Sequence, residues 1–273
     1  MNTEDRRGSP VHPDASRAQT MRRVIVTGAG DGIGRAIALQ FLRQGAQVHG
    51  LDCNAEALQR VADAVSLEPG SVGRFVAHPV NLADRRDTDR AAARLLDVLE
   101  GHCDTLINNA GISRVMPFLR IDDATLDALF AVNFVAAFRL TQRLVPALRA
   151  SGRGSVINIA SELALIGEPG YSAYSATKGA IVAWSRSLAV ELAGSHIRVN
   201  AVCPGPVDTS LLDADFAATG DAVAARGREI AVVPLGRLGM PADIAEVVSF
   251  LASDAAAFVT GVAWAVDGGK TAT

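Results

Sequence analysis

The chain has 273 residues, of which 49% are hydrophobic, 20% charged and 5% aromatic, and its formal net charge is −3. This composition is that of an ordinary globular protein and excludes collagen-like and low-complexity chains. The weak acidic balance argues against nucleic acid and membrane partners, and no uncharged apolar run approaches the roughly 18–20 residues that cross a bilayer. Three widely spaced cysteines form no disulfide framework and no metal cluster, so we expect a reducing, cytoplasmic location and no metal.

The first 21 residues differ from the rest of the chain, because they combine charged residues and prolines with almost nothing to bury. They predict a disordered N-terminal extension. The Arg6-Arg7 pair is followed by no apolar stretch, so an export signal is not expected.

From Arg22 onward, short apolar runs alternate with segments of helical spacing. Strands are predicted at 24–26, 46–51, 74–78, 104–107, 154–159, 197–202 and 263–266. Helices are predicted at 33–42, 55–65, 84–100, 122–148, 171–193 and 241–252. This alternation predicts an α/β fold with a doubly wound, Rossmann-type parallel sheet of about seven strands and helices on both faces.

No linker or repeat divides residues 22–273, which predicts a single domain. Residues 208–232 follow a Pro204-Gly205-Pro206 turn and have the size of a lid over an active site. Their apolar residues, Leu211, Leu212 and Phe216, favour a substrate that is at least partly apolar. The helices at 122–148 and 171–193 are apolar nearly all round, which indicates a second partner such as another subunit.

A glycine-rich turn joins the first predicted strand to the first helix. Gly28, Gly32 and Gly34 follow the spacing G-x-x-x-G-x-G. Asp31 directly precedes Gly32, and Ile33 lies between Gly32 and Gly34. Glycines allow a tight turn and close approach to a pyrophosphate, and the helix N-terminus then offers free N–H groups to the anion. The strict dinucleotide spacing fails at Ile33, but the position between strand and helix still predicts a dinucleotide site.

Asp52 ends the second predicted strand, 18 residues beyond Gly34. A carboxylate at this place binds the hydroxyls of the adenosine ribose. At a distance of about 4 Å, repulsion between this carboxylate and the 2′-phosphate of NADP would weaken binding by roughly 1 kcal/mol in water and roughly 4 kcal/mol at an effective dielectric near 20. We therefore expect NAD rather than NADP.

Tyr174 and Lys178 lie at i and i+4, on one face of a predicted helix. Lowering a tyrosine pKa from about 10 to near 7 takes roughly 4 kcal/mol, which an ammonium about 4 Å away supplies at an effective dielectric near 20. Such a tyrosine serves as a general acid or base at neutral pH. Ser161 follows the strand at 154–159, and strand ends of this kind open onto the ligand crevice. Asn133 interrupts an apolar helix without a local reason.

In these motifs, taken in order, residues 22–273 resemble the single-domain branch of the short-chain dehydrogenase/reductase family. The resemblance also rests on Asn108-Asn109-Ala110-Gly111, on Pro204-Gly205 with Thr209, and on the closing Val266-Asp267-Gly268-Gly269. It implies an enzyme that moves a hydride between NAD and a secondary alcohol or ketone, and a homotetramer.

The resemblance also implies roles for single residues. Tyr174 would exchange the substrate proton, Ser161 would bind the substrate oxygen, and Lys178 would bind the nicotinamide ribose and lower the tyrosine pKa. Asn133 would hold a water that links Lys178 to solvent, and Asn108 would lie against the adenosine ribose. The expected cofactor contacts are completed by Gly28, Asp31, Gly32, Ile33, Gly34, Asp52, Asn109, Ala110, Gly111, Pro204, Gly205, Val207 and Thr209.

One position departs from the family pattern. Asn81, before Leu82, stands where the family usually has an acid that contacts adenine. An amide oxygen still accepts a hydrogen bond, so we expect Asn81 and Leu82 to contact the cofactor with a modest loss of affinity.

Three other functions compete with this interpretation. A 3-oxoacyl-thioester reductase would use NADPH, which Asp52 disfavours. A scaffold that has lost its chemistry would be expected to lack Tyr174 or Lys178. A nucleotide-sugar epimerase would need a larger C-terminal domain. Whether Glu162 faces the pocket or solvent stays open.

Overall fold

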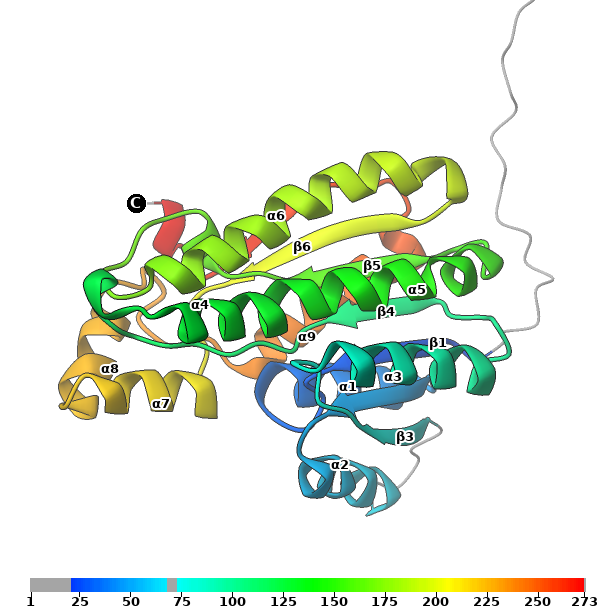
Figure 1. The fold of residues 1–273 in the computed structure, drawn as a ribbon, viewed down its shortest axis with the longest axis horizontal. Helices are drawn as coiled ribbons and strands as arrows, with labels where there is room; N and C mark the ends of the chain where they lie inside the picture. Colours follow the sequence, from blue (N-terminus) through cyan, green and yellow to red (C-terminus); the bar gives the residue numbers. More distant parts are fainter. Residues whose placement is uncertain (1–20, 68–72, 273) are drawn as a thin grey trace, which may run out of the picture.

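A computed structural model describes residues 21–67 and 73–272 of the chain. The described part contains one sheet of seven parallel strands in the order β3-β2-β1-β4-β5-β6-β7 (Figure 1). The strands are β1 (Arg23–Thr27), β2 (Gln47–Asp52), β3 (Arg74–Pro79), β4 (Thr105–Asn108), β5 (Ser155–Ile159), β6 (Arg198–Pro204) and β7 (Ala263–Val266). The predicted fold class is confirmed. Apart from Met21, the predicted N-terminal extension lies outside the described residues.

Helices alternate with the strands, as the sequence pattern predicts. They are α1 (Gly32–Arg43), α2 (Ala55–Leu67), α3 (Arg85–Val98), α4 (Asp123–Phe130), α5 (Ala136–Ala150), α6 (Ser172–Leu192), α7 (Ser210–Ala218), α8 (Ala222–Ala231) and α9 (Pro241–Ala252). Short 3₁₀ turns lie at Phe118–Arg120, Glu162–Ala164, Ala193–Ser195, Asp254–Ala256 and Lys270–Ala272. The single helix predicted at 122–148 is interrupted by a π-helical turn, Ala131–Val135.

Side chains of each strand alternate between two apolar layers, because successive residues of a strand point to opposite faces. Val24 and Val26 pack with α1, α2 and α9, whereas Ile25 between them packs with α3, α5 and the end of α6. Both faces of the sheet are therefore covered by helices, which explains why the central strands β4 and β5 are buried at every position.

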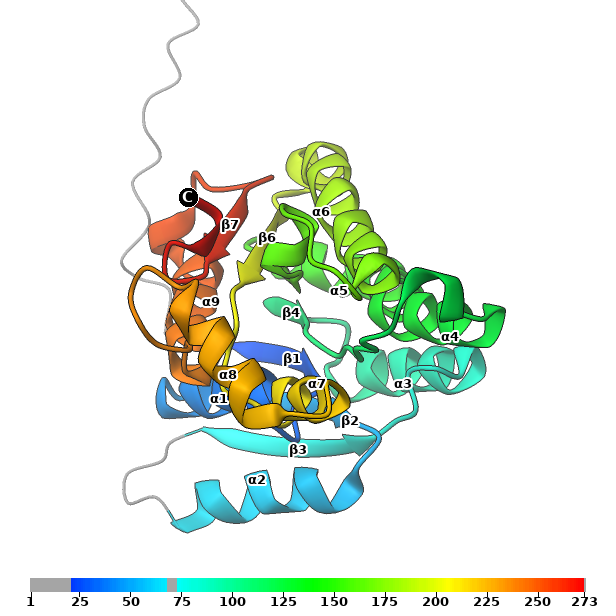
Figure 2. The same cartoon turned by 90° about the vertical axis from the view of Figure 1, so that its left-hand side faces the viewer.

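The strand order reverses between β1 and β4, so the chain segments that leave these two strands diverge and open a crevice. The predicted lid contains two helices, α7 and α8, which contact each other. Figure 2 shows both helices lying across one end of the sheet, next to the segment that follows β6. The crevice thus has a floor of strand ends and a cover of helices.

One segment, Asp123–Ala150, is long enough and apolar enough to cross a membrane, with a mean hydropathy of 1.4 over its best window. Core helices of globular proteins pass the same test. Here Leu140 and Leu144 are fully buried in the layer beneath the sheet, and α5 packs on α3. The π-helical turn also places Asn133 in the middle of the segment. We assign this segment to the core of the domain.

Candidate active site

A cavity of about 740 Å³ lies in the crevice between the strand ends and the lid. Its floor includes the turn after β1, Asp52 at the end of β2, and the segments that follow β4, β5 and β6. The start of α6, both lid helices and Lys270, which follows β7, line the remaining walls. Segments that are far apart in the sequence thus meet around one space.

The glycine-rich turn curves tightly against α1. Gly28 and Gly32 line the cavity and have φ angles of +64° and +51°, which residues with a side chain rarely adopt. Gly34 does not line the cavity: a Cβ atom there would lie 2.0 Å from the Gly28 carbonyl oxygen. Gly34 therefore allows α1 to pack on the turn, while Asp31 and Ile33 lie at the cavity wall.

Asp52 lies at the cavity and is fixed by the backbone around it. Its carboxylate accepts hydrogen bonds from the N–H groups of Gly30, at 3.0 Å, and Asn54, at 2.9 Å. An added Cβ atom at Gly30 would lie 3.0 Å from Asp52 Oδ2, so the turn passes close to the carboxylate. Asp52 is thus held in a set position relative to the glycine-rich turn.

Of the two asparagines after β4, only the second lies at the cavity. Asn109 Nδ2 donates to the carbonyl oxygens of Thr27 and Gly28, at 2.9 and 3.2 Å, which ties β4 to the glycine-rich turn. Asn108 points to the other side and donates to Thr141 and Asn158 in the core. The expectation that Asn108 lies against the adenosine ribose is wrong, because it is the last residue of the strand and faces the helical layer. Ala110 and Gly111 line the cavity beyond Asn109.

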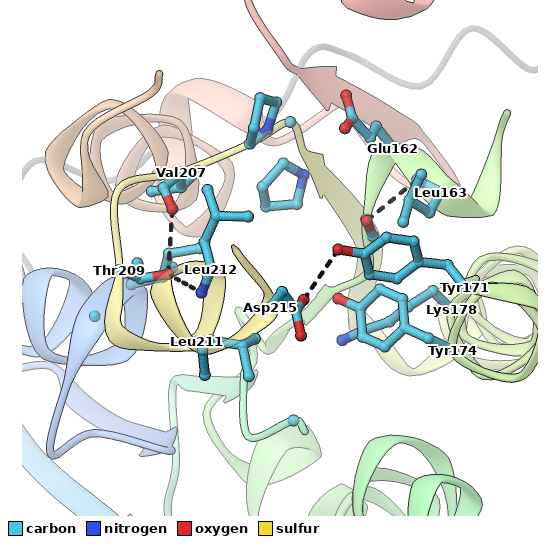
Figure 3. A pocket seen from close by; sticks show the side chains of 18 of the residues that line it. Glu162, Leu163, Tyr171, Tyr174, Lys178, Val207, Thr209, Leu211, Leu212 and Asp215 are labelled. Carbon is cyan, nitrogen blue, oxygen red and sulfur yellow. Dashed lines mark hydrogen bonds between the residues drawn. The ribbon is translucent and has the colours of Figure 1, made fainter. Parts of the chain in front are cut away.

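Ser161, Tyr174 and Lys178 meet at the cavity from two segments. Ser161 follows β5 and accepts a hydrogen bond from the Leu163 N–H at 3.1 Å. Tyr174 and Lys178 lie one turn apart on α6 and both reach toward the lid (Figure 3). The Lys178 ammonium group lies 5.6 Å from the centre of the Tyr174 ring and donates to the Ile159 carbonyl oxygen at 2.9 Å.

Burial of Tyr174 opposes the expected lowering of its pKa by Lys178. Burial raises the pKa of Tyr174, and a hydrogen bond with Ser161 acts in the opposite direction. Burial also lowers the pKa of Lys178 to about 8. The ammonium group lies beside the tyrosine ring and bonds to a carbonyl oxygen, so desolvation outweighs its attraction for the phenolate.

Asn133 is buried behind the cavity rather than in its wall. Its side-chain oxygen accepts from the Ile112 N–H at 2.8 Å, and its amide group donates to the Ile112 carbonyl oxygen and to Thr177 Oγ1, each at 3.0 Å. Both amide protons are therefore engaged, and neither is left for the expected water. The geometry shows that Asn133 ties the segment after β4 to α6, the helix that carries Lys178.

The remaining sequence-predicted cofactor residues divide into two groups. Pro204, Gly205, Val207 and Thr209 line the cavity, and Thr209 caps the N-terminus of α7. Asn81 and Leu82 do not line it. Asn81 is exposed and accepts a hydrogen bond from the Ala83 N–H at 3.1 Å, whereas Leu82 is buried in the apolar layer beneath the sheet. The expected contacts of Asn81 and Leu82 are not part of this cavity.

A buried ion cluster that the sequence analysis missed lies at the substrate end of the cavity. Lys270 donates to Glu162 Oε1 at 2.9 Å and also to Glu229 on α8. All three residues line the cavity, which settles the open question about Glu162. Burial raises the pKa of Glu162 to about 7, although Lys270 acts against this. No local sequence pattern connects these residues, because 108 positions separate Glu162 from Lys270.

A second group, Tyr171 and Asp215, connects the start of α6 to the lid. The Tyr171 hydroxyl donates to Asp215 Oδ2 at 3.3 Å, and its ring packs edge-to-face on the Tyr174 ring at 6.1 Å. Both residues line the cavity. The helical spacing of Tyr171 to Tyr174 would have indicated a neighbour of the catalytic tyrosine, but no sequence signal marks Asp215.

The residues present fit a bound dinucleotide. Gly28 and Gly32 place no side chain at the cavity, the first residues of α1 line the same space, and Asp52 stands at the end of the neighbouring strand. In the described part of the chain, no group of three or more His, Cys, Asp or Glu residues is arranged to hold a metal ion.

Comparisons with known proteins identify relatives along almost the whole chain. A family model described as enoyl-(acyl carrier protein) reductase matches residues 28–271. The 2-(S)-hydroxypropyl-CoM dehydrogenase 3 of Xanthobacter autotrophicus is 38% identical over 249 residues, which are 91% of this chain and 96% of that protein.

Two solved structures share the fold, each with a TM-score of 0.81. One is a 3-ketoacyl-(acyl-carrier-protein) reductase from Brucella melitensis complexed with NADH; it is 32% identical and covers 92% of this chain and 98% of its own. The other, from Beutenbergia cavernae, is described as a putative NAD(P)-dependent gluconate 5-dehydrogenase with bound NADP at low occupancy. It is 36% identical and covers 92% of this chain and 97% of its own.

Proposed function

Because this chain belongs to the short-chain dehydrogenase/reductase family and is an NAD(P)-dependent oxidoreductase acting on CH–OH groups, we propose that it uses NAD to interconvert a secondary alcohol and a ketone. One observation carries the proposal: Ser161, Tyr174 and Lys178 line the same cavity as the glycine-rich turn and Asp52. A hydride acceptor and a proton acceptor would therefore meet at one substrate carbon–oxygen bond.

The preference for NAD rests on Asp52. Its carboxylate is held beside the glycine-rich turn by two backbone N–H groups, and it cannot swing away without losing both bonds. A 2′-phosphate at this place would meet a fixed negative charge, at a cost of roughly 1–4 kcal/mol. A ribose with a free 2′-hydroxyl would instead donate a hydrogen bond.

Each catalytic side chain has a distinct task in the proposed reaction. Ser161 donates a hydrogen bond to the substrate oxygen, and Tyr174 takes up or releases the proton on that oxygen. Lys178, fixed by the Ile159 carbonyl oxygen, binds the nicotinamide ribose and stabilises negative charge on Tyr174. Asn133 positions α6 through Thr177, whose hydroxyl also donates to the Tyr174 carbonyl oxygen at 2.7 Å. The bound NAD⁺ would supply hydride acceptance and a positive ring, which favours the tyrosinate that burial alone disfavours.

A 3-oxoacyl-thioester reductase that uses NADPH is the second candidate, because the matching family model and one solved structure carry acyl-carrier-protein reductase descriptions. Asp52 argues against NADPH. The substrate end of the cavity is also lined by four acidic residues, Glu162, Glu168, Asp215 and Glu229, and by the basic residues Arg228 and Lys270. A scaffold without activity is the third candidate, and the intact set of Ser161, Tyr174 and Lys178 argues against it.

We also propose a homotetramer in the cytoplasm. Large apolar side chains reach the surface in two places: the exposed Phe138 on α5 packs beside the partly buried Trp184 on α6, and the exposed Phe250 on α9 packs beside the exposed Trp264 on β7. Two such patches suit two kinds of subunit contact. Light scattering after size exclusion would show four subunits; a monomer would refute the proposal. Cell fractionation tests the location.

The test of the function is a spectrophotometric assay with NAD(H) and NADP(H). The panel contains secondary alcohols, polyols, cyclic and steroid ketones and 3-oxoacyl thioesters. NAD-linked turnover of an alcohol or ketone supports the proposal. NADP-linked turnover confined to thioesters favours the second candidate, and no turnover on any member favours the scaffold.

A further inference from the structure

The lid helix α7 places one carboxylate opposite the catalytic side chains. Asp215 is 9% exposed and lines the cavity. In Figure 3 its carboxylate group lies across the cavity from the ends of Tyr174 and Lys178. Its negative charge is close enough to contribute to the raised pKa of Tyr174. A substrate bound to Tyr174 would therefore lie next to Asp215.

The position of Asp215 is set by Tyr171. The Tyr171 hydroxyl donates to Asp215 Oδ2, and the Tyr171 ring rests on the Tyr174 ring. Because the two tyrosines share the first turns of α6, the carboxylate on the lid is held at a defined place relative to the catalytic hydroxyl. A carboxylate accepts up to about four hydrogen bonds, so Asp215 retains acceptor capacity beyond Tyr171 and the nearby Ser113 hydroxyl.

The surrounding charges favour a neutral partner for this carboxylate. Burial raises the pKa of Asp215, while Arg114 acts in the opposite direction. Arg228, Lys270 and Lys178 line the same cavity, together with the carboxylates of Glu162, Glu168 and Glu229. Lys270 pairs with Glu162 and Glu229, so charges of both signs already surround this end of the cavity. A hydroxyl group would donate to Asp215 without adding a further charge.

We propose that Asp215 is a specificity-determining residue that accepts a hydrogen bond from a second hydroxyl group on the carbon next to the reacting carbon. The inference rests on the proposed function and names its substrate class: vicinal diols and the matching α-hydroxyketones. The adjacent apolar side chains of Leu211 and Leu212 would contact the carbon skeleton. A plain ketone would leave a buried carboxylate facing an apolar surface, which disfavours its binding.

The experiment compares matched substrates that differ in one hydroxyl group. The pairs are cyclohexanol with trans-1,2-cyclohexanediol, and 2-butanol with 2,3-butanediol, each oxidised with NAD⁺. For the intact enzyme we expect kcat/KM to be at least about tenfold higher for the diol, as for a hydrogen bond to a charged group. In Asp215→Ala this ratio should fall to within about threefold of one, through loss on the diol and gain on the plain alcohol.

Two further variants separate recognition from folding. Asp215→Asn keeps the shape and one acceptor oxygen, so its ratio should lie between those of the other two forms. Tyr171→Phe keeps the Asp215 carboxylate but removes the hydrogen bond that positions it. This change should raise KM for the diol more than it lowers kcat. Thermal unfolding of each variant checks that the domain is intact.

Binding gives a readout that does not depend on turnover. In NADH-loaded Tyr174→Phe, calorimetry should show tighter binding of 2-hydroxycyclohexanone than of cyclohexanone, and the added Asp215→Ala change should remove the difference.

The outcomes distinguish the inference from the proposed function. Turnover of plain alcohols with equal or lower values for diols, or equal loss on both in Asp215→Ala, overturns the inference and leaves the function standing. In trans-2-aminocyclohexanol an ammonium group replaces the second hydroxyl group of the diol. Faster turnover of this amino alcohol than of the diol also overturns the inference. No turnover of any alcohol with either cofactor, together with no ketone binding, overturns both.

Discussion

The two ends of the cavity are built by different means. At the cofactor end, segments that are close together in the chain form most of the wall: the glycine-rich turn, the first turn of α1 and the end of β2 at Asp52. At the substrate end, side chains from distant segments make the wall, and polar contacts such as Lys270 with Glu162 and Tyr171 with Asp215 hold them together. The first end depends on local chain geometry, and the second depends on contacts between the lid, α6 and the C-terminal turn.

This difference has a functional meaning. NAD and NADP share the same pyrophosphate, so one arrangement of the glycine-rich turn can serve either cofactor without variation. A substrate end made of side chains on a lid can change its chemistry by single substitutions and leave the fold intact. Five single substitutions test this division between the two ends of the cavity.

Tyr174→Phe removes the proposed proton acceptor from the boundary between the two ends. We expect kcat to fall by about 10²–10⁴-fold, the usual contribution of a general acid or base. The dissociation constant of NADH should stay within about threefold, as fluorescence titration will show. Tyr171→Phe is the matched control, because it removes a hydroxyl from the same cavity and should keep turnover of plain alcohols within about tenfold. Full turnover in Tyr174→Phe would contradict the assignment.

Gly34→Ala tests the backbone cradle. The added Cβ atom would lie 2.0 Å from the Gly28 carbonyl oxygen, which is backbone and cannot move without shifting the turn. We expect the free energy of unfolding to fall by about 1–3 kcal/mol and NADH binding to weaken. Gly179→Ala on α6, where a Cβ atom meets nothing within 4 Å, is the control and should change stability by less than about 1 kcal/mol. Equal stability in the two variants would refute the packing role of Gly34.

Asp52→Asn removes the charge at the ribose end and keeps its shape. The ratio of NADPH to NADH affinity should rise by about tenfold or more, since the repulsion of the 2′-phosphate is worth roughly 1–4 kcal/mol. Asp122→Asn, at the N-terminus of α4 outside the cavity, should leave the ratio unchanged. An unchanged ratio in Asp52→Asn would show that another group selects the cofactor.

Glu162→Gln tests the ion cluster at the substrate end. The pKa of Glu162 is raised from 4.5 to about 7, so between these pH values the folded protein binds more protons than the unfolded chain. Stability from this group is therefore lost as pH rises from about 4.5 to 7, by up to about 3 kcal/mol. Urea unfolding at pH 5 and pH 7.5 should show a smaller loss in Glu162→Gln than in the unchanged protein. Glu191→Gln, an exposed change on α6, should keep the original slope.

Asn81→Ala should have the smallest effect. Asn81 is exposed, its side-chain oxygen accepts from the Ala83 N–H, and it does not line the cavity. We expect the NADH dissociation constant to change by less than about twofold in fluorescence titration. A tenfold loss would restore the contact with adenine that the sequence analysis expected.

The cofactor end was predictable because its features are local. A strand, a glycine-rich turn and a helix follow one another in the chain, and Asp52 ends the next strand, so spacing alone brings them together. The choice between Asn108 and Asn109 was not predictable in this way. The two are adjacent at the end of β4, and the period of two in a strand sends one into the core and the other to the cavity.

The substrate end was only partly predictable. The lid followed from the length of the segment after β6, but its two helices, the position of Asp215 on α7 and the pairing of Lys270 with Glu162 depend on tertiary packing. The raised pKa of Tyr174 was missed for a related reason: spacing on a helix places Lys178 near Tyr174 but does not measure how much water both residues lose.

The central claim is that hydride moves between the two ends of this cavity, from an alcohol carbon at the lid to a nucleotide at the glycine-rich turn. The most direct measurement uses the panel alcohols deuterated at the carbinol carbon, with NAD⁺, and determines the mass of the reduced nucleotide. The account predicts NADH that carries one deuterium from at least one alcohol. Unreduced nucleotide with every alcohol, or reduced nucleotide without deuterium, would contradict it.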